Sequence, residues 1–135
     1  MNYDPVFDKW HEECGVFGVY DRTVDVARYV YWGLFALQHR GQESAGIAVT
    51  DGHDVELKKG MGLLTEAIKE LPSLPSHMGT GHVRYSTTGS NNPRNIQPLV
   101  IHYQGGQIAV AHNGNLTNAL AIRKRLEADG SIFQT

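Results

Sequence analysis

Residues 24–37 have the periodicity of a helix, yet they carry apolar side chains around most of its circumference. Ala27, Tyr31 and Leu34 mark the helical period, while aromatic and β-branched residues occupy much of the remaining surface. A helix that is apolar on most sides must be covered on most sides. We expect it either to lie between layers of one domain or to contact a partner, and the sequence leaves both arrangements open.

Short apolar runs bounded by turn residues predict strands on both sides of this helix. The predicted strands are residues 14–20, 44–50, 54–59, 81–85, 99–103 and 107–112, with hairpin turns at 51–53 and 105–106. Two more helices are predicted at residues 65–71 and 117–128, the second with Leu120, Ile122 and Leu126 toward a core. Strands in antiparallel pairs, with helices in separate blocks, predict an α+β fold.

The composition excludes several classes of partner. The 135 residues are enough for one domain, and 12 Lys and Arg against 14 Asp and Glu give a net charge of −2. No basic cluster is present that would bind nucleic acid or an anionic membrane. No run approaches the ~18 apolar residues of a membrane span, and residues 1–13 are a polar arm without a signal-peptide pattern. We therefore expect a soluble, cytoplasmic protein.

Cys14 is the single cysteine, so neither an internal disulfide nor a cysteine-based metal site is expected. The histidines show no ligand-like spacing either, and we expect no metal site. A lone cysteine can simply fill space as a small hydrophobic residue. If the chain were cut before Cys14, however, a thiol and a free α-amine would share one residue, and an amine pKa of about 7.7–8.0 suits a base at neutral pH.

Two further segments carry groups suited to chemistry at an amide. Asn113 and Gly114 lie between a predicted strand and a predicted helix rather than in a hairpin, where their N–H groups can converge on a developing oxyanion. Arg84 ends a predicted strand and can hold a carboxylate in bidentate fashion or form a surface ion pair. Arg40, close to the end of the long helix, is favourable there without any further role.

Together, five segments resemble the glutaminase domain of the amidophosphoribosyltransferase family. They are CGVFGVY, LQHRGQESAGI, GHVRYSTTG, QPL and AHNGNL, in the order and with the spacing of that family. The resemblance covers Glu13 to Thr135 and is closest to the branch made with a short propeptide, here residues 1–13. It implies a glutaminase domain at residues 14–135 with a four-layer αββα sandwich of the N-terminal-nucleophile hydrolase type.

The resemblance also implies roles for individual residues. Cys14, freed of its propeptide, would attack the carboxamide of glutamine with its own α-amine as base. Asn113 and Gly114 match the oxyanion donors of the family, and Arg84 matches the arginine that binds the glutamine α-carboxylate. Residues that would line the pocket or position Cys14 are Arg40, Tyr85, Ser86 and Thr87. The ammonia would travel to a second domain and displace pyrophosphate from phosphoribosyl pyrophosphate, which opens purine nucleotide synthesis.

The sequence departs from the family at its C-terminal side. It stops at Thr135, before the acidic stretch whose Asp binds the glutamine α-amine, and it lacks the phosphoribosyltransferase domain. We therefore expect a fragment with little or no glutaminase activity alone. No cofactor is expected in this chain. For the full-length enzyme the resemblance implies Mg²⁺ and a homo-oligomer, and it leaves a 4Fe–4S cluster open.

Two other functions remain open on the sequence alone. The chain could be the glutaminase module of another class II amidotransferase, because a fold does not fix the acceptor of the ammonia. It could also be a non-catalytic binding domain in which Cys14 is structural. Tyr85 stands where the sugar-aminating relatives carry Trp, and this favours the purine enzyme.

Overall fold

The computed structural model describes residues 14–85, 92–114 and 116–133. The elements follow in the order β1 (Gly15–Tyr20), α1 (Val26–Ala36), the 3-10 turn η2 (Gln38–Arg40), β2 (Ser44–Thr50), β3 (Val55–Met61), α2 (Leu64–Ala67), β4 (Met78–Arg84), the 3-10 turn η3 (Pro93–Asn95), β5 (Leu99–Tyr103), β6 (Gly106–Val110) and α3 (Ala119–Ala128). The strands pair in antiparallel fashion, with helices between them in the chain, and the predicted α+β fold is confirmed.

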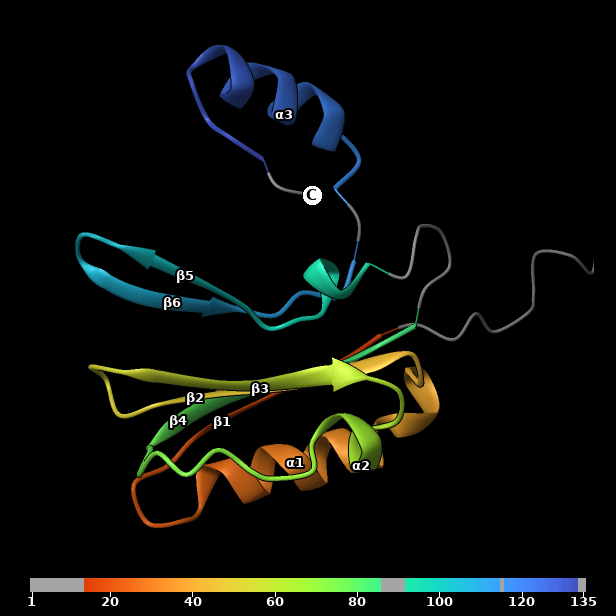
Figure 1. Ribbon diagram of the computed structural model, residues 1–135, viewed down its shortest axis with the longest axis vertical. Helices are drawn as coiled ribbons and strands as arrows, with labels where there is room; N and C mark the ends of the chain where they lie inside the picture. The colour runs from red at the N-terminus through yellow and green to blue at the C-terminus, as the bar shows by residue number, and fades with distance from the viewer. Residues whose placement is uncertain (1–13, 86–91, 115, 134–135) are drawn as a thin grey trace, which may run out of the picture.

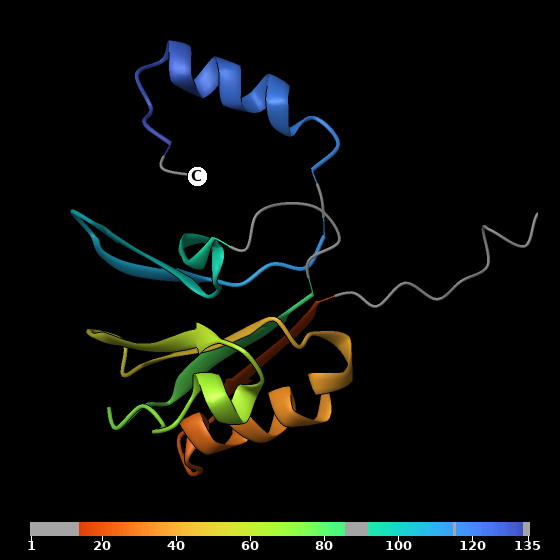
Figure 2. The ribbon, with the colours of Figure 1, turned by 45° about the vertical axis from the view of Figure 1, so that its right-hand side comes forward.

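These elements stack in four layers in the order α, β, β, α (Figure 1). One sheet has the strand order β1-β4-β2-β3, and the hairpin of β5 and β6 forms the other sheet. All four strand pairings are antiparallel. Figure 2 shows α1 and α2 on the outer face of the four-stranded sheet and α3 beyond the hairpin. The four-layer order implied by the resemblance is therefore present.

The core lies between α1 and the four-stranded sheet. Val30 and Leu34 of α1 are fully buried, and they belong to one apolar cluster with Ile47 of β2 and Val83 of β4. Successive residues of a strand point to opposite faces, so the odd-numbered residues of β2 and β4 meet the helix. Gly81 permits the close approach, because a Cβ there would lie 2.6 Å from Cδ1 of Leu34.

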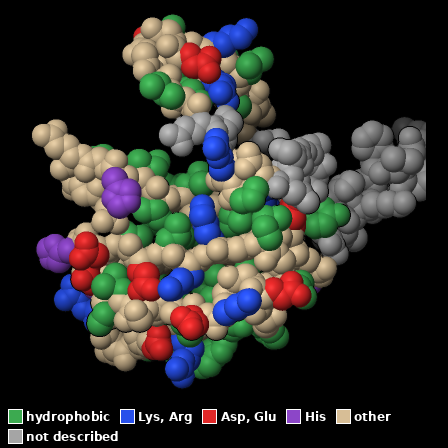
Figure 3. All heavy atoms as spheres, in the orientation of Figure 1, with side chains coloured by type: hydrophobic (Ala, Val, Ile, Leu, Met, Phe, Trp, Pro, Cys, Tyr) green, Lys and Arg blue, Asp and Glu red, His purple; other side chains and the backbone are tan. Residues whose placement is uncertain are grey.

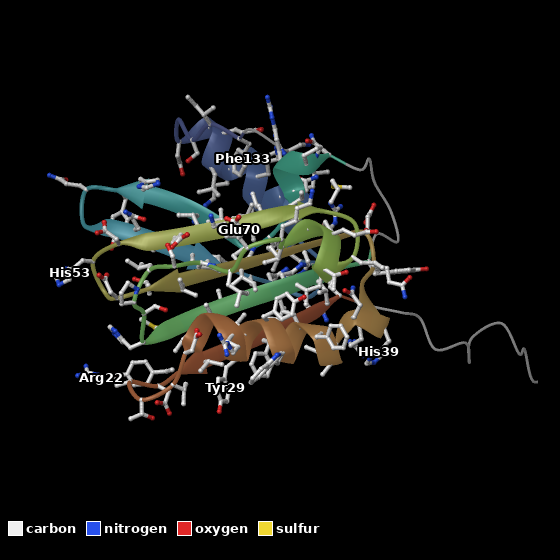
Figure 4. The ribbon with its side chains drawn as sticks, turned by 60° about the horizontal axis from the view of Figure 1, so that its bottom comes forward. Arg22, Tyr29, His39, His53, Glu70 and Phe133 are labelled. Atoms are coloured by element: carbon white, nitrogen blue, oxygen red, sulfur yellow. The ribbon has the colours of Figure 1, made fainter. Side chains whose placement is uncertain are left out.

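The long helix is an outer layer, so the expectation that it could lie between two layers is wrong. The strands that α1 contacts, β1, β2 and β4, all lie on one side of it. Tyr29, Trp32 and Phe35 are 46%, 56% and 59% exposed. Tyr29 points away from the sheet (Figure 4). The outer apolar residues are large aromatic side chains, and within the described chain the helix is buried through one face only.

The second predicted helix is shorter than expected. It spans Leu64–Ala67 rather than residues 65–71. Glu56 of β3 accepts hydrogen bonds from the N–H groups of Ser73 and Leu74, at 2.8 and 2.7 Å, which holds the chain after the helix in a non-helical path. Pro72 acts in the same direction, since the residue before a proline is disfavoured in a helix.

The apolar face of the last helix is not buried as predicted. None of the residues of α3 is buried, and Leu120 and Ile122 are 67% and 40% exposed. Within the described chain α3 lies apart from the hairpin of β5 and β6 rather than packed on it (Figures 1 and 2), so its apolar side chains stay exposed.

On the face drawn in Figure 3, acidic and basic side chains are interspersed over the described surface, and charges of one sign do not gather in a patch. None of the described helices has the length and apolar character needed to cross a membrane.

Candidate active site

The predicted site residues come from three element ends that meet at one end of the molecule. Cys14 precedes β1, Tyr85 follows β4 and Asn113 follows β6 (Figures 1 and 2). Because β1 and β4 are antiparallel, with Gly15 opposite Val83, the start of one strand adjoins the end of the other. The segment between α1 and β2 reaches the same place.

The thiol of Cys14 lies against the backbone that follows β4. Its Sγ is 3.4 Å from the carbonyl oxygen of Tyr85 and 3.4 Å from the amide nitrogen of the same residue. Cys14 is partly exposed rather than enclosed in the core. Cys14 therefore lies at the edge of the fold rather than within its core.

The carbonyl oxygen of Cys14 accepts hydrogen bonds from two distant segments. Nδ2 of Asn113 donates at 2.7 Å across 99 residues of sequence, and Nε of Arg40 donates at 3.4 Å across 26 residues. These contacts orient the backbone of the candidate nucleophile. The amide nitrogen of Asn113 carries a second hydrogen, which can serve another acceptor such as an oxyanion.

The segment with Asn113 and Gly114 connects a strand to a helix, as predicted. β6 ends at Val110 and not at His112, because the N–H of His112 donates to Oε1 of Gln97 at 2.6 Å instead of joining the sheet. Gly114 has a φ of +145°, a conformation that favours glycine. Asn113 and Gly114 are both exposed.

Arg84 is the last residue of β4 and faces a carboxylate of its own chain. Its Nε lies 4.0 Å from Oε2 of Glu43, and the two side chains are only 15% and 17% exposed. The pair is therefore largely buried rather than a surface ion pair. Its Nη atoms provide the donors that a substrate carboxylate would need. Binding of a substrate carboxylate by Arg84 remains a prediction.

The remaining predicted residues divide into two groups. Arg40 and Tyr85 contact Cys14 directly, through its carbonyl and its sulfur. Ser86 and Thr87 lie outside the described residues, as do residues 1–13. Among residues 14–85, 92–114 and 116–133, no group of three or more His, Cys, Asp or Glu side chains could hold a metal ion.

His82 was not predicted as part of this region. Its side chain is fully buried on β4, two residues before Arg84, and neither ring nitrogen makes a well-aligned hydrogen bond within the described chain. The pKa of His82 is lowered to about 4, mainly by burial and also by the positive charge of Arg84. A weak hydrogen-bonding interaction with the backbone of His112 acts in the opposite direction and raises the pKa. The imidazole is therefore neutral at pH 7. The alternation of the strand could have revealed it, because His82 lies between Gly81 and Val83 of a largely buried strand.

Two other side chains escaped the sequence reasoning, Gln38 of η2 and Glu43 before β2. Gln38 hydrogen-bonds with the backbone of Gly41 and Leu64, and Glu43 pairs with Arg84. Both lie in the segment LQHRGQESAGI, from which only Arg40 was assigned a role.

An αββα sandwich that presents a cysteine at the start of its first strand, beside an Asn-Gly pair and two arginines, defines a class of amide-cleaving protein. A model of the class-II glutamine amidotransferases matches residues 40–130 of the chain. The chain belongs to the class-II glutamine amidotransferases.

Individual relatives narrow the similarity further. The amidophosphoribosyltransferase of Methanocaldococcus jannaschii is 50% identical over 123 residues, which are 89% of this chain and 26% of the relative. That of Bacillus subtilis is 48% identical over 128 residues, 93% of this chain and 27% of the relative. The structure of the B. subtilis glutamine phosphoribosylpyrophosphate amidotransferase, complexed with ADP and GMP, superimposes with a TM-score of 0.81 at 46% identity, over 89% of this chain and 26% of that one. The chain spans about a quarter of the length of these relatives.

Proposed function

We propose that residues 14–135 are the glutamine-hydrolysing domain of an amidophosphoribosyltransferase, and that residues 1–13 are a propeptide. The observation that carries the proposal is the convergence on Cys14, where Asn113 and Arg40 bind its carbonyl and the backbone of Tyr85 lies at its sulfur. Relatives that are 48% and 50% identical bear the name of this enzyme.

The first half of the reaction needs a free amine at Cys14. With residues 1–13 attached, the nitrogen of Cys14 is a peptide amide and cannot accept a proton. Hydrolysis of the preceding peptide bond leaves a primary amine with a pKa of about 7.7–8.0, which takes the proton of the thiol. The thiolate attacks the carboxamide carbon of glutamine, and the carbonyl electrons move to its oxygen. Asn113 and Gly114 stabilise this oxyanion through their N–H groups.

The second half releases the products. The protonated amine of Cys14 returns its proton to the amide nitrogen, ammonia leaves, and a γ-glutamyl thioester remains. Water then loses a proton to the same amine and attacks the thioester, which frees glutamate and restores the thiol. Arg84 would bind the α-carboxylate throughout, and the resemblance assigns Tyr85, Ser86 and Thr87 to the same substrate site. This assignment is that of an N-terminal-nucleophile hydrolase.

The ammonia is then used on phosphoribosyl pyrophosphate, where it displaces pyrophosphate and forms 5-phosphoribosylamine, the first step of purine synthesis. A separate phosphoribosyltransferase domain performs this step. The Mg²⁺ expected for this second step would be bound outside the described residues, which contain no group of three or more His, Cys, Asp or Glu side chains that could hold a metal ion. The same holds for a 4Fe–4S cluster. No step above is routed through either group. The proposal includes the cytoplasmic location and the homo-oligomeric state expected from the sequence.

The test uses the natural full-length protein that contains these residues. Mass spectrometry should show that the mature chain begins at Cys14. The glutamine-analogue electrophile 6-diazo-5-oxo-norleucine should add once, at Cys14. Cys14→Ser should abolish synthesis from glutamine and leave synthesis from ammonia, which does not need the thiol. A protein that keeps residues 1–13 and still hydrolyses glutamine would contradict the mechanism, and an unlabelled Cys14 in the mature protein would indicate a structural role.

A further inference from the structure

The side chain of Gln38 joins two segments near the candidate active site. Its Nε2 donates to the carbonyl oxygen of Gly41, and its Oε1 accepts a hydrogen bond of 2.7 Å from the N–H of Leu64. Leu64 is the first residue of α2, so its N–H has no partner within that helix. One carboxamide therefore uses both of its polar atoms, and it attaches the turn after α1 to the start of α2.

The turn that Gln38 closes is packed tightly against β4. Gly41 is buried, and a Cβ there would lie 2.6 Å from the carbonyl carbon of Val83 and 2.7 Å from the backbone nitrogen of Arg84. Two residues further along, the N–H of Glu43 donates to the carbonyl of Arg84 at 3.0 Å. The position of the turn is thus coupled to the part of β4 that leads directly to the sulfur of Cys14.

Arg40 lies inside this turn, between Gln38 and Gly41, whose carbonyl the carboxamide binds. Its backbone N–H donates to Leu37 at 2.9 Å, and its Nε donates to the carbonyl of Cys14. A change in the turn would move the guanidinium away from that carbonyl. At 3.4 Å this hydrogen bond is already long, so a further displacement would break it.

We propose that Gln38 is a positioning residue, which holds the turn of Arg40 so that Arg40 orients the carbonyl of the nucleophile Cys14. The inference rests on the proposed function, because it matters only if Cys14 reacts. Gln38 acts through Arg40 and is remote from the reacting atoms. Misplacement of a reacting group by about 1 Å can cost as much as 10²-fold in rate.

Two substitutions separate the contacts of Gln38. Gln38→Glu keeps an oxygen for the N–H of Leu64, but a carboxylate cannot donate to the carbonyl of Gly41 and repels it. Gln38→Met keeps the length of the side chain and loses both hydrogen bonds. Gln104→Glu is the matched control, because Gln104 is exposed in the turn between β5 and β6, away from the site.

The first measurement is the rate of glutamine hydrolysis by the mature full-length protein. We expect kcat to fall about 10- to 100-fold in both Gln38 variants, with KM for glutamine changed less than about threefold, because the substrate-binding groups are not altered. Gln104→Glu should match the parent protein. Thermal unfolding gives the folded fraction, so a loss of folded protein is separated from a loss of rate. If the Gln38 variants had the same kcat per folded molecule as the parent protein, the proposal would be overturned.

The second measurement does not depend on activity. The Nε–H resonance of Arg40 in nuclear magnetic resonance reports its hydrogen bond to the carbonyl of Cys14, through its chemical shift and its exchange with water. We expect the shift to approach that of a free guanidinium, with faster exchange, in both Gln38 variants and not in Gln104→Glu. An unchanged Arg40 signal would overturn the positioning role. If the parent protein failed to hydrolyse glutamine, the proposed function would fail, while this signal would still decide whether Gln38 positions Arg40.

Discussion

Among single residues, Asn113 has two tasks that are compatible in one side chain. Its Nδ2 donates to the carbonyl of Cys14 at 2.7 Å, and the second hydrogen of the same nitrogen is available to an oxyanion. Gly114 supplies a backbone N–H beside it, in a positive-φ conformation that other residues seldom adopt. In the proposed reaction, the pair would both place the nucleophile and stabilise the charge that its attack creates.

Asn113→Ala should lower kcat for glutamine hydrolysis by roughly 10²- to 10³-fold, because one donor to the oxyanion is lost. KM should change much less, since the oxyanion exists only in the transition state. Steady-state kinetics of the mature full-length protein measure both values. Asn118→Ala is the control, because Asn118 precedes α3 and its side chain makes no capping hydrogen bond. A kcat that Asn113→Ala leaves unchanged would remove Asn113 from the proposed reaction.

At the scale of elements, the closeness of α1 to the sheet depends on small residues in β4. Gly79 and Gly81 face the helix, and side chains of Val26, Val30 and Leu34 occupy the space that their Cβ atoms would need. Cores are packed as densely as organic crystals, so such a contact tolerates little added volume.

Gly81→Ala should lower the free energy of unfolding by roughly 1–3 kcal/mol, because the added methyl group overpacks the contact with Leu34 and Val30. Urea unfolding followed by circular dichroism measures the change. The matched control is Gly18→Ala in β1 of the same sheet, where the nearest atom to the new Cβ would be 3.7 Å away. Comparable stability losses in the two variants would show that the helix–sheet distance is not the cause.

The elements were predictable where the sequence pattern is local. The bounds of β2 and β5 agree with the expected strands, because alternating apolar residues and flanking turns mark them. The length of α2 was not predictable, since it depends on the carboxylate of Glu56, which lies in the strand β3 and binds the chain that follows the helix. The burial of α3 was not predictable either, because periodicity identifies an apolar face and does not show what covers it.

For the whole molecule, a neutral histidine inside the fold links stability to pH. In the unfolded chain the pKa of His82 is 6.5, and in the folded chain burial lowers that pKa to about 4. Between these two values the unfolded state binds more protons, so protonation favours unfolding. His82 therefore does not reduce the free energy of unfolding above pH 6.5, where it is neutral in both states. As the pH falls from 6.5 toward 4, it lowers the free energy of unfolding progressively.

The free energy of unfolding should therefore fall by up to about 3 kcal/mol from this group between pH 7 and pH 4. His82→Gln has no group that titrates in this range and should show a shallower decline, which urea unfolding at intervals from pH 7.5 to 4.5 would measure. The lower limit avoids protonation of Asp21 and Asp51, whose pKa values are lowered by hydrogen bonds from Thr23 and Asp54. Parallel pH profiles for the two proteins would contradict the assignment.

The candidate site was predictable only in part, because some of its contacts join segments that are distant in the sequence. Cys14 and Asn113 carry groups whose chemistry is evident from the sequence, Arg40 and Tyr85 were assigned through the resemblance, and the structure brings all four into contact. Other site residues have partners that are ordinary polar residues of another segment. Arg84, for example, pairs with Glu43. Their role depends on pairing between strands that are distant in sequence, and no local pattern encodes it.

The hydrogen bonds to the main-chain oxygen of Cys14 are independent of the atom at the tip of its side chain. An alcohol at position 14 would therefore occupy nearly the same place as the thiol, although it would be a far poorer nucleophile. Crystals of such a mature protein soaked with glutamine would accumulate the intact amide, and they would reveal which groups touch the substrate before any bond changes.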